Sequence, residues 1–249
     1  MPYKAHSKEP DVNVPKPKLG WCNEKNLWYY FKNDNNKAIG WTLVDGYWYY
    51  FYDSGNMINS GFQTIYGTLY YFHEGGAMAS GEWLGEKYIY PNGRIIDASP
   101  NMCNSKTQYY LFKYMTDKNN QEDIDATAIR LHGGSYSNNC VYFLSECLRR
   151  VGFNIPNSTC NTTQISYILS QKGFGKSYNL SSLRPGDVVL SGSTHAFIFM
   201  GWADDNHDYA YIVDNQKSKF GQVMHLRKIY GYDASNDTDP STHYFYYRY

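Results

Sequence analysis

Three residues in the second half of the chain have the side chains that nucleophilic catalysis needs. Cys140 supplies a thiol, His195 an imidazole that can take its proton, and Asp214 a carboxylate that can orient the imidazole. Together they form the cysteine version of the catalytic triad. Asn215 and Gln216 follow Asp214 directly and are alternatives for the third member. This chemistry uses no metal and no cofactor, so none is expected.

The residues after position 137 predict a helix that begins at Cys140. A buried stripe at the spacing i, i+3, i+4, i+7 consists of Leu144, Cys147, Leu148 and Val151. Asn138 or Asn139 can cap the start of this helix, and Gly152 can end it. The first turn of a helix has free N–H groups and a positive dipole end, which favour a thiolate. Cys140 is therefore the candidate nucleophile, and Cys147 is interpreted as an inert core thiol.

Three apolar strands are predicted to place the other two residues. A Pro-Gly-Asp turn at 185–187 leads into the first strand, His195 opens the second, and the third, 209–213, ends at Asp214. Two other histidines are weaker candidates for the base: His207 lies in a polar turn, and His132 precedes two glycines.

This arrangement resembles the papain-like peptidoglycan hydrolases, which include the CHAP group, the NlpC-type peptidases and a related amidase group. The pattern Asn139-Cys140-Val141-x-Phe143 is most similar to CHAP domains, and 185–188 and 195–198 match their strands. The resemblance implies a papain-like α+β domain with a small antiparallel sheet over residues 101–249. Asp214 falls at the acidic third position of CHAP domains. The backbone N–H of Cys140, with the side chain of Asn139, would stabilise the oxyanion.

An aromatic repeat with a period of about 20 residues fills the first hundred positions. Gly-Trp at 20–21 recurs at 40–41, then as Gly-Phe at 61–62 and Gly-Glu-Trp at 81–83. A run of aromatic residues follows in each unit: WYYF at 28–31 and 48–51, LYYF at 69–72, YIY at 88–90. Units this short bury their faces on their neighbours, which predicts a β-hairpin solenoid over residues 20–98. Period-2 alternation puts Trp48 and Tyr50 on one face and Tyr49 and Phe51 on the other.

The repeats resemble the choline-binding, cell-wall-binding repeat family. By that resemblance, aromatic cages hold a quaternary ammonium through cation–π attraction. One cage would consist of Trp21, Trp28 and Tyr50, and the next of Trp41, Trp48 and Tyr71, with Met57 lining. The third unit has Phe62 and Leu69 in place of the two tryptophans, which counts against a cage there. Related repeats hold carbohydrate, so the partner is choline-substituted teichoic acid or a wall glycan.

Composition limits the remaining possibilities. Lys+Arg and Asp+Glu both number 23, so the formal net charge of zero gives no long-range attraction to nucleic acid or an anionic membrane. Aromatic residues make up 18% of the chain although mean hydropathy is −0.61, which indicates many partly exposed rings. Five cysteines at irregular spacing suit neither a disulfide framework nor a C-x-x-C zinc site. No stretch approaches the ~20 apolar residues of a membrane span.

Residues 1–19 are predicted to be a flexible, proline-containing leader. They lack the apolar core of a secretory signal peptide, so the protein is expected at the cell wall after release from the cytoplasm, as with a phage-encoded endolysin. The leading hypothesis is a peptidoglycan amidase or endopeptidase anchored to the wall by its repeats. Two alternatives stay open: an inert wall-binding or adhesion protein, and a toxin or effector acting on an amide outside the wall.

Overall fold

The computed structural model describes residues 19–33, 36–230 and 244–249 and combines α-helices with antiparallel sheets. The chain forms two compact units, residues 1–79 and 80–249. The predicted leader lies almost wholly outside the described residues.

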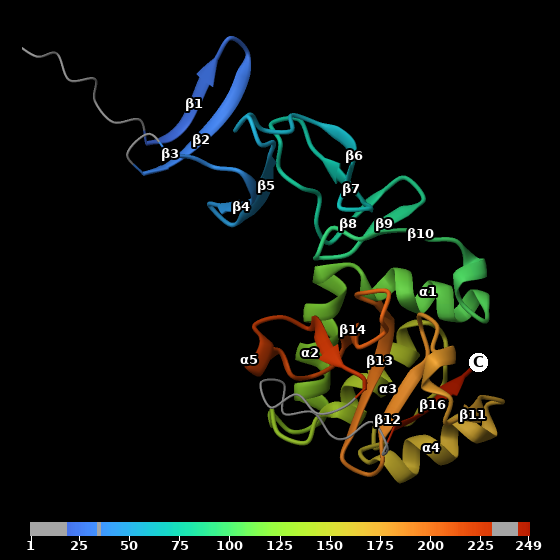
Figure 1. Ribbon diagram of the computed structural model, residues 1–249. Helices are drawn as coiled ribbons and strands as arrows, with labels where there is room; N and C mark the ends of the chain where they lie inside the picture. The colour runs from blue at the N-terminus through green and yellow to red at the C-terminus, as the bar shows by residue number, and fades with distance from the viewer. Residues whose placement is uncertain (1–18, 34–35, 231–243) are drawn as a thin grey trace, which may run out of the picture. The chain divides into compact units, whose positions relative to one another are not determined.

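The first unit is a series of β-hairpins, coloured blue to cyan-green in Figure 1. Its strands are β1 (Gly20–Glu24), β2 (Leu27–Asn33), β3 (Asn36–Lys37), β4 (Gly40–Val44), β5 (Tyr47–Phe51), β6 (Gly61–Ile65) and β7 (Thr68–Phe72). Each aromatic run is the second strand of its hairpin. In the β4–β5 hairpin, Asp45 and Gly46 both have positive φ, at 50° and 85°. Such two-residue turns match the right-handed twist of the strands they join.

The glycine-to-methionine segment of each unit connects neighbouring hairpins. Met57 N–H donates to the Trp28 carbonyl at 2.8 Å, whereas Ile58 N–H donates to Tyr50 of its own hairpin at 3.0 Å. The next unit repeats the arrangement, because Met78 N–H donates to the Trp48 carbonyl at 2.8 Å. The last aromatic residue of each run is buried in the solenoid core. The core therefore consists of contacts between successive units, as the short repeat predicts.

The fourth hairpin continues the repeats in sequence but belongs to the second unit by packing. It comprises β8 (Glu82–Leu84), β9 (Lys87–Ile89) and β10 (Ile95–Asp97). Tyr90 is 1% exposed, stacks on Tyr211 at 5.1 Å between ring centroids, and donates its hydroxyl to the Met200 carbonyl at 2.8 Å. Trp83 donates its indole N–H to Thr116 at 2.8 Å. These rings are part of the main core of the second unit.

The rest of the second unit is a six-stranded antiparallel sheet with helices on one face. The helices are α1 (Lys106–Met115), α2 (Lys118–Leu131), α3 (Cys140–Arg150), α4 (Thr162–Gln171) and the short α5 (Lys217–Phe220). The strands are β11 (Gly175–Ser177), β12 (Val188–Ser191), β13 (His195–Trp202), β14 (Tyr209–Val213), β15 (Met224–Lys228) and β16 (Tyr244–Arg248). Their order in the sheet is β11-β16-β12-β13-β14-β15.

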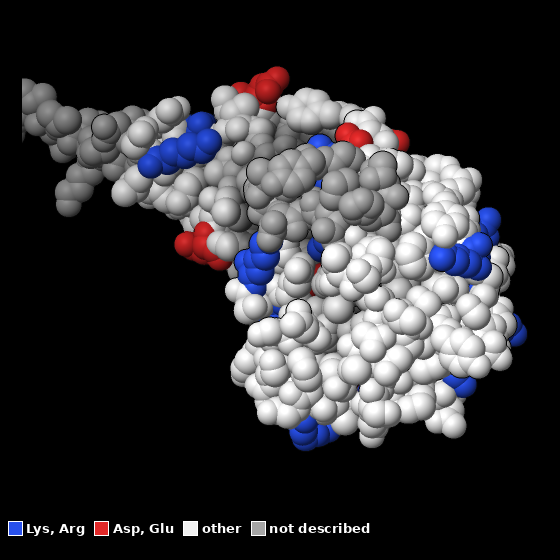
Figure 2. All heavy atoms as spheres, turned by 90° about the horizontal axis from the view of Figure 1, so that it is seen from below, with Lys and Arg blue, Asp and Glu red and all other residues white. Residues whose placement is uncertain are grey.

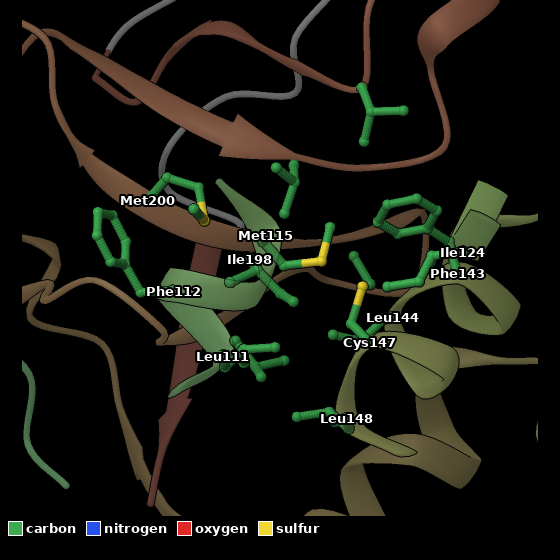
Figure 3. Close-up of a cluster of buried hydrophobic side chains, with 14 of the residues drawn as sticks. Leu111, Phe112, Met115, Ile124, Phe143, Leu144, Cys147, Leu148, Ile198 and Met200 are labelled. Carbon is green, nitrogen blue, oxygen red and sulfur yellow. The ribbon is translucent and has the colours of Figure 1, made fainter. Parts of the chain in front are cut away.

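Alternating residues of the central strands enter two separate cores. Ile198 and Met200 pack with α1, α2 and α3, where Phe112 and Leu144 are fully buried (Figure 3). The alternate residues of β13, which include Phe197, lie on the other face of the sheet and pack with side chains of β16 and of the segment before β12. This alternation gives the two faces of the sheet different environments.

No helix among the described residues is long and apolar enough to cross a membrane. On the face shown in Figure 2, lysines and arginines lie scattered among uncharged residues and form no continuous patch.

Candidate functional site

Cys140 is the first residue of α3, as the sequence predicts. Its side chain is 9% exposed, and it follows Asn138, whose φ of 52° turns the chain into the helix. The apolar stripe of α3 packs into the main core, where Leu144 and Cys147 are fully buried. Burial raises the pKa of the Cys147 thiol well above its ordinary value, in line with an inert core cysteine. The helix is thereby anchored with Cys140 at its first turn.

His195 lies between Cys140 and Asp214. Its Nε2 is 2.8 Å from Asp214 Oδ2, and its ring also forms a hydrogen bond with the Cys140 side chain. Since Nε2 faces the carboxylate, Nδ1 is the ring nitrogen left for the thiol. His195 is 8% exposed and Asp214 is completely buried. The three predicted residues are therefore brought together by α3, the start of β13 and the end of β14.

The surroundings of His195 favour its protonated form. Burial opposes a positive charge, but the hydrogen bonds with Asp214 and Cys140 outweigh it and raise the pKa of His195 from 6.5 to about 9. Burial also acts to raise the pKa of Asp214, yet the hydrogen bond and charge of His195 hold it below its ordinary value. The pair is therefore an imidazolium beside a carboxylate at neutral pH.

Asn139 and Asn215 lie on either side of this set. Asn139 is 1% exposed, and its Oδ1 has no hydrogen-bond partner among the described residues; the same holds for Asn215 Oδ1. Both line a cleft of about 390 Å³ with residues of α2 and α5, including Asp125 and Lys217. Cys140 and His195 are not among the lining residues, so the cleft meets the site through Asn139 and Asn215, the chain neighbours of Cys140 and Asp214. Gln216, the other alternative third residue, donates its backbone N–H to Asp214 Oδ1 at 2.8 Å.

The two weaker candidates for the base, His207 and His132, have packing roles. His207 stacks on Trp202 at 4.5 Å between ring centroids, in the turn between β13 and β14. His132 caps the end of α2 and stacks on Tyr142 at 4.7 Å. Among the described residues, no group of three or more His, Cys, Asp or Glu side chains is arranged to hold a metal ion.

The Pro-Gly-Asp turn also has a structural position. Asp187 is fully buried and accepts hydrogen bonds from the side chains of Gln108 at 2.7 Å and Arg248 at 2.9 Å. It therefore holds α1 and the last strand together. A larger hollow of about 690 Å³, lined by Trp83, Tyr110 and Lys113 among others, includes neither Cys140 nor His195.

Two residues of β15 also lie at the site, although the sequence did not predict them there. His225 is 2% exposed, and its Nδ1 lies 3.8 Å from Asp214 Oδ1. Arg227 is also 2% exposed, with Nη1 at 3.9 Å from Asp214 Oδ2. Burial lowers the pKa of His225, so this ring is neutral. The available signal was the alternation in the strand Met224–Lys228, which puts both residues on one face.

The repeat unit contains two aromatic clusters with partly exposed rings. In the first, Trp21 lies 6.4 Å from Trp28 and 4.8 Å from Tyr49 between ring centroids. These three rings and Met57 line a hollow of about 340 Å³. Trp21 and Trp28 are 37% and 42% exposed, which is unusual for large rings in a repeat core.

The second cluster has the same geometry one unit further along the chain. Trp41 lies 6.4 Å from Trp48 and 4.8 Å from Tyr70. In both clusters two tryptophans come from one hairpin and a tyrosine comes from the next.

The third ring of each cluster differs from the prediction. Tyr50 packs beside Trp41 of its own hairpin at 5.3 Å, and Tyr71 packs beside Phe62 at 5.0 Å. The predicted clusters took the third ring from the same strand face as the tryptophans. In the structure each hairpin presents the opposite face to its predecessor, so the residue one position earlier, Tyr49 or Tyr70, completes the cluster.

Comparison with known proteins identifies the family of the repeats. Residues 38–83 match the family model described as the choline-binding repeat. They form a choline-binding repeat module. Such repeats imply association with the cell wall. No curated protein sequence matches the chain.

Solved structures from Streptococcus pneumoniae are similar to the choline-binding repeat module. CbpJ of strain TIGR4 is 31% identical with a TM-score of 0.30, over 32% of this chain and 27% of CbpJ. The choline-binding domain of Spr1274 is 30% identical with a TM-score of 0.31, over 32% of this chain and 98% of that domain. The modular autolysin LytC, solved with a synthetic peptidoglycan ligand, is 26% identical with a TM-score of 0.24, over 31% of this chain and 23% of LytC. This chain thus spans about a quarter of CbpJ and of LytC.

Proposed function

We propose that the second unit is a papain-like cysteine hydrolase that cleaves an amide bond of peptidoglycan, and that the choline-binding repeats hold it on choline-bearing wall polymers. The observation that carries the proposal is the hydrogen-bonded series from Cys140 through His195 to Asp214. A nucleophile, a base and a group that orients the base are the parts that acyl transfer requires.

The chemical steps follow from the positions of these groups. The Cys140 thiolate attacks the amide carbonyl carbon, and the backbone N–H of Cys140, which has no acceptor within the helix, stabilises the oxyanion. His195 then gives its proton to the leaving amine, and an acyl-thioester remains on Cys140. Water, deprotonated by His195, releases the carboxylic acid and restores the thiol. Asp214 holds the ring with Nδ1 toward the sulfur throughout.

The cleft lined by Asn139 and Asn215 is suited to a polar, extended substrate. Its lining includes Asp125 and Lys217, of opposite charge, and the aromatic ring of Tyr136, which is 72% exposed. The amide oxygens of Asn139 and Asn215 are acceptors without donors in the described structure. A peptide backbone, with its regularly spaced N–H groups, supplies such donors.

The repeats add affinity for the wall and need no strong individual site. Three rings around one quaternary ammonium, at ~0.5–1 kcal/mol for each exposed contact, give binding in the millimolar range or weaker. A polymer bearing many choline groups occupies both clusters at once and raises the effective concentration of the hydrolase at the wall.

The decisive experiment compares the single-residue variants Cys140→Ala and Cys160→Ala. Cys160 is an exposed cysteine outside the site, so its variant controls for the loss of a reactive thiol. Lysis of choline-bearing walls is measured by turbidity, and wall binding by sedimentation with the walls. We expect Cys140→Ala to bind without lysing and Cys160→Ala to do both.

Lysis by Cys140→Ala at the rate of the unmodified protein would disprove a cysteine mechanism. Binding without lysis by the unmodified protein on every wall tested would identify an adhesion protein instead. Mass spectrometry of the digestion products then distinguishes an amidase from an endopeptidase.

A further inference from the structure

Arg227 is a buried cation that packing alone does not explain. Its side chain is 2% exposed, on the sheet face opposite the helices, and its guanidinium lies over the Phe197 ring at 5.3 Å. Burying a guanidinium costs several kcal/mol, which an apolar side chain of similar volume would avoid. A residue of this kind in a core is therefore expected to serve a second purpose.

The guanidinium is held in one orientation by two neutral partners. Arg227 Nε donates to the Tyr244 hydroxyl at 3.3 Å, and Nη1 donates to Gln216 Oε1 at 3.2 Å. Gln216 in turn donates its backbone N–H to Asp214 Oδ1. Neither partner carries a charge, so these bonds direct the cation without neutralising it.

The charge that neutralises Arg227 belongs to the site. Arg227 Nη1 lies 3.9 Å from Asp214 Oδ2, the same oxygen that is 2.8 Å from His195 Nε2. One carboxylate oxygen is therefore shared between a permanent cation and the imidazole. Because Arg227 is also charged, the Asp214 carboxylate attracts the His195 proton less than it would if Arg227 were absent.

We propose that Arg227 is a positioning residue of the cysteine site, which keeps Asp214 in its charged form and limits how strongly that carboxylate holds the proton of His195. The proposal rests on the proposed function for its catalytic meaning, but its electrostatic content can be measured without substrate. A carboxylate that held the imidazole proton too strongly would leave a poor general acid for the leaving amine.

Other titratable and charged groups also face this cluster: Cys140 from α3, Asp125 from α2, His225 from β15 and Tyr244 from β16. Lys217 of α5 acts on Asp125 and is paired with Glu122 of α2. Asp125 acts on Asp214 through its charge only. His225 is neutral, since burial lowers its pKa and its Nδ1 donates to the Val223 carbonyl at 3.1 Å. Among these described groups, Arg227 is thus the permanent cation that lies beside Asp214.

The test is an NMR titration of the His195 ring in the full chain, with the signal assigned from His195→Ala. In Arg227→Met we expect the titration midpoint to rise by about half to one pH unit, because a neighbouring positive charge has been removed. Arg227→Gln, which keeps a hydrogen-bond donor without the charge, should give the same rise and serves if the Met variant does not fold. Arg227→Lys should return the midpoint toward that of the unmodified protein. Tyr244→Phe, a control that removes one hydrogen bond and no charge, should leave it unchanged.

An unchanged or lowered midpoint in a folded neutral variant would overturn the proposal. A shift equally large in Tyr244→Phe would also overturn it, since orientation and not charge would then be responsible. Wall hydrolysis by the same proteins separates the two ideas. The expected shift in a chain that hydrolyses nothing would refute the proposed function alone, whereas hydrolysis without the shift would refute the role of Arg227 alone.

Discussion

Removal of Tyr49 tests the observed geometry of the first aromatic cluster against the predicted one. In the structure Tyr49 closes the hollow formed by Trp21, Trp28 and Met57. Tyr50 instead packs beside Trp41 of its own hairpin and Tyr66 of the next. Tyr49→Ala should therefore weaken choline binding at this cluster, and Tyr50→Ala should leave the first cluster able to bind.

The expected magnitude follows from the exposure of the rings. Because the two tryptophans are 37% and 42% exposed, the lower range for a cation–π contact applies, ~0.5–1 kcal/mol for the lost ring. That energy is equivalent to an increase of about two- to fivefold in Kd. Tyr49 also makes an edge-to-face contact with Trp21, so the free energy of unfolding should fall by ~1 kcal/mol.

The assay is calorimetric titration of the full chain with choline chloride, supported by retention on a resin bearing quaternary ammonium groups. Tyr29→Ala is a matched control, because Tyr29 has the same place in its WYYF run but lies against Lys37. Tyr70→Ala should reproduce the effect at the second cluster. In the double variant the two increases in Kd should multiply. A Tyr49→Ala protein that binds choline as the unmodified chain does would refute the assignment of the third ring. If a glycan released the bound protein and choline did not, the rings would stack on sugars.

Two further predictions concern the second unit. The raised pKa of His195 contributes stability that is fully present below pH 6.5 and is lost as pH rises through about 9. The free energy of unfolding should therefore fall by about 3 kcal/mol across that window, and Asp214→Asn should flatten most of the fall, as urea titrations at a series of pH values will show. Gly201→Ala should cost ~1–3 kcal/mol, because φ is 148° and a Cβ would overlap the Tyr90 hydroxyl. Thermal unfolding in a Tyr90→Phe background, which removes the overlap with the hydroxyl and leaves the ring carbon at 2.8 Å, should show a smaller cost. An equal cost in both backgrounds would argue against the contact with the hydroxyl.

The parts of the structure that depend on local periodicity could be predicted. The stripe of apolar residues predicted the helix after Cys140, and the paired strands before His195 and Asp214 followed from short apolar runs between turns. The hairpins followed from a repeated motif with Asp45-Gly46-type turns. In each of these, the residues that decide the structure are close together in the chain.

The parts that depend on which face meets which neighbour could not be predicted. Alternation placed Tyr49 and Tyr50 on opposite faces, but it does not say which face the next hairpin presents. The strand that carries His225 and Arg227 has these two polar residues on its inward face, so it lacks the apolar pattern of a buried strand. These two residues lie near Asp214 because β15 pairs with β14. Alternation within β15 puts them on one face but does not specify which strand lies beside them.

The packing of Tyr90 has a consequence for how such chains can be recombined. A chimera joined after residue 98, where the repetitive sequence ends, would remove Tyr88 and Tyr90 from the main core and leave the Met200 carbonyl without its donor. Losing a buried aromatic side chain costs ~3–5 kcal/mol, a large part of the stability of an ordinary domain. A junction between residues 79 and 80 keeps those contacts intact. The piece that can be exchanged between binding modules is therefore residues 80–249, a unit that carries the cysteine site and has the last repeat as part of its own interior.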